Sequence, residues 1–113
     1  MDTGIRRSER IEILGTLEGD VTVVQPMRVR QISADGASVE TSIALQVDSL
    51  HELKLALGAT PVVIKGRVVH SRVSDVDQDV VTYRTGIEFV ELTQHAREAI
   101  QEFLKSLKAG RAV

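Results

Sequence analysis

Apolar and polar residues alternate along most of the chain, and clusters of turn residues separate the alternating stretches. In one stretch, Leu53, Leu55 and Leu57 alternate with polar or small residues. A period of two is typical of strands that bury one face. The pattern predicts strands over residues 10–17, 21–32, 37–40, 50–57, 62–73 and 80–91. Pro26 interrupts the second stretch, because proline cannot donate to a ladder, so we expect six or seven strands in an antiparallel barrel or sandwich.

The period changes at Thr93, where a helix is predicted. Apolar residues then recur at steps of three and four, namely Leu92, Ala96, Ala99, Ile100, Phe103, Leu104 and Leu107. This is the spacing of an amphipathic helix. We expect it over residues 93–108, with Thr93 as the N-cap and Gly110 as the terminator. The helix has one apolar stripe, so it should pack on the barrel or close the mouth of the barrel. The expected fold class is all-β with one C-terminal helix.

Composition indicates one ordinary globular domain with an aliphatic core. A length of 113 residues fits one domain, and one Tyr, two Phe and no Trp leave the core to aliphatic side chains. A net charge of −2 argues against a general nucleic-acid binder, because such proteins are usually strongly basic. The absence of Cys excludes a disulfide framework, a thiolate zinc site and a cysteine nucleophile. No apolar run could span a membrane and the first residues lack the apolar stretch of a signal peptide, so we expect a cytoplasmic protein.

No arrangement of residues predicts catalysis or a metal site. The histidines are His51, His70 and His95. They fall on different predicted elements, and none has a carboxylate or a second histidine at metal-ligand spacing. The stretch Asp75–Asp79 resembles the start of a calcium loop, but Val80 and Gly86 stand where that loop needs Gly and Glu, so a solvated turn is favoured. With no nucleophile motif and no phosphate-binding glycine loop, we predict neither an enzyme nor a cofactor.

Two polar stretches could carry binding chemistry. The first is Arg6–Arg10, before the first predicted strand, in which Arg6 and Arg10 are four residues apart and can point in the same direction. Guanidinium groups hold phosphate through a rigid fork and stack on flat rings. The second is Gln31–Gly36, where a strand ends in a polar turn whose glycine permits a positive φ and a close backbone approach. Each stretch alone is as well explained by a solvated arm or an ordinary turn.

In this order and at this distance, the two stretches resemble the PilZ domain, the bacterial receptor module for cyclic di-GMP. That family has Arg-x-x-x-Arg before its first strand, which Arg6 and Arg10 match. It then has Asp/Asn-x-Ser-x-x-Gly, which Ser33 and Gly36 match. The last predicted strand and the helix also agree with the family. The resemblance implies a small antiparallel β-barrel, here of six to seven strands.

The resemblance covers about residues 5–107 and sets the expected domain organisation. Residues 1–9 would form a flexible basic arm. Residues 10–108 would form a single barrel domain that includes the helix over residues 93–108.

The resemblance also implies a ligand site. Arg6 and Arg10, helped by Arg7, would clamp the phosphates and guanine faces of cyclic di-GMP, while Ser33 and Gly36 cradle the other side. Ordering the arm would be the signal. Because no second domain is expected, the signal would pass to a separate, unidentified protein partner.

One position departs from the family pattern, because Gln31 stands where the family has Asp or Asn. A carboxylate accepts from the guanine edge as a charge-assisted pair, whereas glutamine offers a neutral acceptor. The loss is about 1–2 kcal/mol, or roughly ten- to thirtyfold in affinity. The alternative function is a degenerate PilZ-type interaction module that docks on a protein without nucleotide. A nucleic-acid-binding barrel is less favoured, because the chain lacks net positive charge and stacking aromatics.

Overall fold

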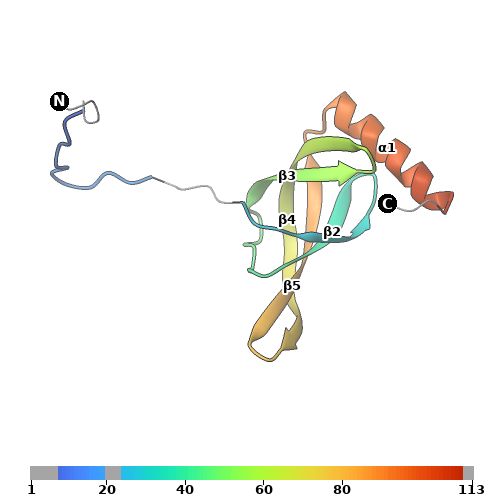
Figure 1. Cartoon of the computed structure of the whole chain (residues 1–113), viewed down its shortest axis with the longest axis horizontal. Coiled ribbons are helices and arrows are strands. Elements are labelled where there is room, and N and C mark those ends of the chain that lie inside the picture. Colours follow the sequence, from blue (N-terminus) through green and yellow to red (C-terminus); the bar gives the residue numbers. More distant parts are fainter. Residues whose placement is uncertain (1–7, 20–23, 111–113) are drawn as a thin grey trace.

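The structure, a computed structural model, describes residues 8–19 and 24–110. These residues form β1 (Arg28–Ile32), β2 (Gly36–Thr41), β3 (Leu50–Leu57), β4 (Thr60–Asp77), β5 (Val80–Val90) and α1 (Gln94–Lys108). The strands make one antiparallel sheet in the order β1-β2-β5-β4-β3. Figure 1 shows the sheet curled into a half-barrel, with α1 along one end and a ribbon of β4 and β5 projecting from the other. The predicted all-β fold with one C-terminal helix is confirmed.

The core lies on the inner face of the curled sheet. Its buried strand residues are Val39, Leu53, Leu55, Leu57, Val62, Ile64, Val68, Ile87 and Phe89. All but Phe89 are aliphatic, as the composition predicts. Along β3, exposed positions alternate with these buried leucines, so the period of two in the sequence corresponds to one inward and one outward face.

The helix α1 covers one end of this core. Ala96 and Ile100 are its buried residues. Thr93 caps the N-terminus, because its Oγ1 accepts from the backbone N–H of Ala96 at 3.1 Å and satisfies one of the donors that a helix start leaves unpaired. Gly110 follows the C-terminal end with a left-handed φ of 79°. The predicted helix, its cap and its terminator are confirmed.

The N-terminal part differs from the prediction. Residues 8–19 form no strand, their side chains are exposed, and Figure 1 shows them extending away from the sheet. The strand expected over residues 10–17 is therefore absent, since a strand needs a neighbour to pair with. β1 begins at Arg28, after Pro26, and is shorter than predicted; residues 21–23 of that predicted strand lie outside the described residues. The described sheet has five strands instead of six or seven.

The ribbon of β4 and β5 is also longer than predicted. The sequence suggests a turn over Asp75–Asp79, but β4 continues to Asp77 and the turn consists of Gln78 and Asp79. Gln78 has a φ of 58°, the left-handed conformation that tight hairpins require. Asp75 and Asp77 alternate with Val76, and this alternation is typical of a strand. The polarity of these residues, taken alone, predicts a longer turn.

Candidate functional site

The turn between β1 and β2, Ser33–Gly36, is held by hydrogen bonds within the turn and by one hydrogen bond to β5, and is termed the fastened turn. The backbone N–H of Ser33 donates to the Gly36 carbonyl at 2.8 Å. The Ser33 hydroxyl donates to the Asp35 carboxylate at 2.9 Å and accepts from the Asp35 backbone N–H at 3.4 Å. The Asp35 carbonyl accepts from the backbone N–H of Phe89 at 2.9 Å. Ser33 therefore shapes a polar turn that is held in one conformation while its side chains stay exposed.

Gly36 allows a close approach between β2 and β5. It pairs with Glu88, and a Cβ built on it would lie 2.6 Å from the carbonyl oxygen of Ile87. An ordinary contact is 3.4–4 Å, so no other residue fits without a shift of the backbone. Its φ is not left-handed. Of the two reasons predicted for this glycine, the close approach is confirmed and the positive φ is wrong.

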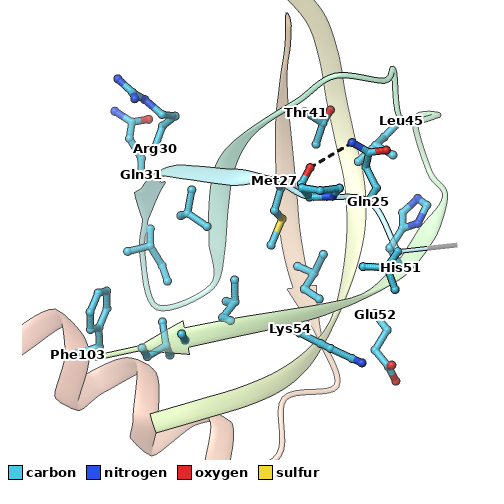
Figure 2. A pocket seen from close by; sticks show the side chains of 18 of the residues that line it. Gln25, Met27, Arg30, Gln31, Thr41, Leu45, His51, Glu52, Lys54 and Phe103 are labelled. Atoms are coloured by element: carbon cyan, nitrogen blue, oxygen red, sulfur yellow. Dashed lines mark hydrogen bonds between the residues drawn. The ribbon is translucent and has the colours of Figure 1, made fainter. Parts of the chain in front are cut away.

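A bulge at Arg30 sets the orientation of Gln31. Val29 pairs with Val39 and Gln31 with Ser38, so Arg30 is the extra residue in the strand. Both Arg30 and Gln31 are exposed. Figure 2 shows their side chains close together beside the cavity between β1 and β3, and both are among the residues that line it. Gln31 lies opposite Ser38, which is followed in β2 by the buried Val39, so Gln31 is on the outer side of β1, directly before the fastened turn.

A row of charged residues crosses the outer face next to Gln31. In the strand register, Arg28 lies opposite Glu40, Glu40 opposite Arg84, and Arg84 opposite Arg72; these four residues are termed the arginine row. Arg84 Nη2 lies 3.7 Å from Glu40 Oε2, and Arg84 Nη1 donates to the Ser38 hydroxyl at 3.2 Å. Arg84 Nε is buried with no hydrogen-bond partner among the described residues. The row contains three guanidinium groups and one carboxylate, so its net positive charge can attract an anion.

His70 and Gly86 add a flat element to this face. Gln31, Ser38, Gly86 and His70 follow one another across β1, β2, β5 and β4. A Cβ on Gly86 would lie 2.2 Å from His70 Nε2, so the imidazole ring packs over the glycine. His70 is exposed. An exposed ring beside a basic row is a surface on which a flat base can stack.

Arg67 and Glu88, which neighbour this surface, form an ion pair and neutralise each other's charge. Arg67 Nη2 donates to Glu88 Oε1. The hydrogen bond and the charge of Glu88 raise the pKa of Arg67 above its ordinary value. The pair cancels its own charge and adds no net charge to the outer face.

Of the predicted arginine arm, the structure describes only Arg10. Arg6 and Arg7 lie outside the described residues. Arg10 is exposed and belongs to the segment that extends away from the sheet (Figure 1), so the expectation that it begins the first strand is wrong. The structure brings together the three predicted ligand-binding residues of the β1–β2 hairpin and leaves Arg10 apart from them.

Residues 8–19 and 24–110 contain no cluster of three side chains suited to hold a metal ion. No helix in those ranges has the length and apolar character needed to cross a membrane.

Sequence reasoning missed the arginine row and His70. A polar residue that alternates with apolar ones in a strand faces outward, and this signal marks Arg72 and Arg84 as outer-face residues. It does not say which strands are neighbours. The arginine row forms only because β4, β5, β2 and β1 are adjacent in a particular register.

The fold and this surface define a class of protein, a small curled antiparallel sheet with one C-terminal helix and a row of arginines on its outer face. The chain matches the PilZ domain family over residues 5–106 and belongs to that family. No curated protein and no solved structure matches it. Membership makes the chain a cyclic di-GMP receptor module or a related interaction domain, in a family of binding domains.

Proposed function

We propose that the protein binds cyclic di-GMP on the outer face of β1, β2 and β5 and passes the signal to a separate protein. The observation that carries the proposal is the fastened Ser33–Gly36 turn on the same outer face as the arginine row, in a chain of the PilZ family. The ligand is a ring with two phosphates and two guanines. The outer face offers guanidinium groups for the phosphates and a polar turn with a neighbouring ring for a base.

Half of this site is preformed. Arg84 is held by Glu40 and Ser38, so little side-chain entropy is lost when its guanidinium meets a phosphate. Gln31 faces a guanine edge as a neutral acceptor and donor. His70 stacks on a base, which requires only an exposed ring face.

The other half of the site is the arm that contains Arg6, Arg7 and Arg10, which the family resemblance assigns to ligand binding. These arginines close over the phosphates and guanine faces from the side opposite the turn. Fixing the arm costs roughly 1–2 kcal/mol per residue in backbone entropy, so its closure requires the ligand contacts. The change in the arm is the signal that a partner protein reads.

A calorimetric titration with cyclic di-GMP, with GTP and cyclic di-AMP as controls, tests the proposal. We expect binding of cyclic di-GMP and none, or much weaker binding, of the controls. Arg84→Ala should weaken binding by about ten- to a hundredfold, the loss of a charged hydrogen bond. The matched control is Arg97→Ala, which removes an exposed arginine from α1.

Arg84 is partly buried, with a side-chain exposure of 24%, so its replacement could also disturb the fold. Arg72→Ala changes an exposed side chain of the same row and provides a second variant. It should weaken binding while circular dichroism stays unchanged. The proposal is refuted if the folded wild-type protein gives no heat with cyclic di-GMP at millimolar concentration.

A second candidate function is docking on a partner protein without nucleotide. Gln31 favours it, and so does the projecting ribbon. Val73 pairs with Tyr83, and Val76 with Val81, on the face continuous with the core. Val73 and Val76 are 52% and 61% exposed. An uncovered apolar strip is typical of a protein contact surface, so a folded protein that gives no heat with cyclic di-GMP would leave docking as its function.

A further inference from the structure

The ribbon of β4 and β5 leaves a long strand edge without a neighbour. β3 pairs with β4 only as far as Arg67, and loop residues bond to the backbone of Val68. From there to Asp77, β4 pairs with β5 on one side, and no other described residue pairs with it. Figure 1 shows this ribbon projecting beyond the body of the sheet. A two-stranded ribbon alone is marginally stable in water, and an open edge is a template for a further strand.

A bulge in β4 determines which side chains of this edge share a face. Ser74 is the extra residue, because consecutive residues of β5 pair with Val73 and with Asp75. β5 itself is regular here, so its alternate residues face one side, and their partners in β4 face the same side. The outer-face partners are His70, Arg72, Asp75 and Asp77, and the inner-face partners are Ser71, Val73 and Val76. The bulge therefore places Arg72 and Asp75 on one face.

The outer-face side chains of the edge change sign along the strand. His70 and Arg72 lie nearer the body of the sheet, Asp75 and Asp77 lie nearer the tip of the ribbon, and all four are exposed. Charges on an edge strand normally keep other strands away. Here their order is self-complementary, because an identical strand that runs the opposite way brings its acids to the basic end of the first. Opposite charges that face each other on neighbouring strands stabilise the pair.

We propose that the open β4 edges of two copies pair antiparallel about a twofold axis, which makes the protein a dimer with a continuous ribbon of four strands. In this register Arg72 lies opposite Asp75 of the second copy, and His70 lies opposite Asp77 of the second copy. Twofold symmetry makes each of these contacts twice. The Val73 side chains of the two copies meet at the axis on the inner face.

The charges select this register and this occupant. Residues directly opposite each other in an antiparallel pair lie on the same face, a condition that Arg72 and Asp75 meet because of the bulge at Ser74. If the axis lay one residue nearer the tip, the Asp75 carboxylates of the two copies would face each other and repel. The occupant is a second copy because the edge itself carries both halves of the complementary pattern.

The dimer shares one residue with the proposed nucleotide site. Arg72 is the last member of the arginine row, and in the dimer a carboxylate of the second copy lies opposite it. A phosphate and the second copy therefore compete for the same guanidinium group. By linkage, cyclic di-GMP should shift the equilibrium toward the monomer. This consequence rests on the proposed function, whereas the dimer itself does not.

Sedimentation equilibrium of the full chain, without nucleotide, tests the pairing. We expect a reversible dimer. Asp75→Arg places an arginine opposite Arg72 and should raise the dissociation constant by about tenfold or more. Combining it with Arg72→Asp restores opposite charges and should restore the dimer. The matched control is Asp79→Arg, which makes the same change of charge at an exposed position of the turn, outside the paired residues, and should leave the dissociation constant unchanged.

Two outcomes of this experiment would overturn the proposal. One is a folded wild-type protein that stays monomeric up to about 1 mM. The other is a double variant that dimerises no better than Asp75→Arg alone while circular dichroism shows both to be folded.

Two cysteine variants test the register, because the chain has no cysteine of its own. Val73 and Val76 share the inner face and are 52% and 61% exposed. In the proposed register the Cα atoms of the two Val73 residues are roughly 6 Å apart, and those of the two Val76 residues roughly 17 Å. A disulfide spans about 4.4–6.8 Å between Cα atoms. Mild oxidation should therefore cross-link Val73→Cys and not Val76→Cys, and equal cross-linking of the two variants contradicts the register.

The nucleotide separates this proposal from the proposed function. Cyclic di-GMP should raise the dissociation constant of the dimer, and binding that leaves this constant unchanged refutes the competition for Arg72. A dimer that gives no heat with cyclic di-GMP refutes the proposed function alone. A protein that binds cyclic di-GMP and stays monomeric without it refutes the dimer alone.

Discussion

Replacement of Gly36 by alanine tests whether the turn is positioned by contact between the backbones of β2 and β5. A Cβ at this position would lie 2.6 Å from the Ile87 carbonyl oxygen, and the two strands would have to part by about 0.8 Å to reach an ordinary contact of 3.4 Å. The obstacle is backbone, which cannot rotate out of the way as a side chain can. We therefore expect Gly36→Ala to destabilise the fold.

The expected loss has two parts. Overpacking of this kind costs about 1–3 kcal/mol. The strand shift also weakens the nearby hydrogen bond from the Phe89 N–H to the Asp35 carbonyl, which is worth about 1 kcal/mol net. A total of about 2–4 kcal/mol is a large share of the 5–15 kcal/mol that stabilises an ordinary domain. It corresponds to a fall in melting temperature of roughly 10–20 °C.

Thermal unfolding followed by circular dichroism measures the effect, with two glycines as controls. Gly19→Ala adds a Cβ that meets nothing within 4 Å, so it should be neutral or slightly stabilising through the unfolded state. In Gly86→Ala the atoms nearest to the added Cβ belong to the ring of His70, which is exposed and can swing aside, so this variant should cost less than Gly36→Ala. If Gly36→Ala melts within about 2 °C of the wild type, the close approach does not constrain the turn.

Two further predictions concern the site and the helix. Gln31→Asp should tighten cyclic di-GMP binding about tenfold in calorimetry, because a carboxylate accepts from the guanine edge with charge assistance; weaker binding would place this position near a phosphate. Thr93→Ala should cost about 1 kcal/mol, because the Ala96 N–H loses its cap at 3.1 Å, and the melting temperature should fall by about 4–8 °C. An unchanged melting temperature would mean that packing of α1, and not its cap, sets the helix boundary.

The elements found from the sequence are those whose signals are local. Residues 50–57 alternate cleanly and form β3 with the predicted bounds, and Thr93 is the N-cap that the change of period indicates. The segment over residues 10–17 alternates as well, yet it forms no strand in the structure. Alternation indicates that a segment is suited to a half-buried strand. It does not show which strand, if any, the segment pairs with.

One part of the candidate site could also be predicted from the sequence, and the other part could not. The Ser33–Gly36 turn is contiguous in sequence, and the residue types that form it are turn residues, so it could be predicted. The arginine row is assembled from β1, β2, β4 and β5 by their register. The bulges after Val29 and Val68 shift that register by one residue each. Because one residue reverses the face of every later side chain, the outer-face partners of Arg84 could not be assigned from the sequence.

The glutamine at position 31 has an effect that depends on the arginine row beside it. A carboxylate there would offset part of the positive charge of the arginine row, which contains three arginines and Glu40, and glutamine leaves that charge intact. Attraction to phosphates is therefore kept while recognition of the guanine edge is weakened. Phosphate contacts do not distinguish one cyclic dinucleotide from another, whereas contacts to base edges do. We expect this chain to differ from family members with the acid more in its preference for cyclic di-GMP over cyclic di-AMP than in its attraction to dinucleotides in general.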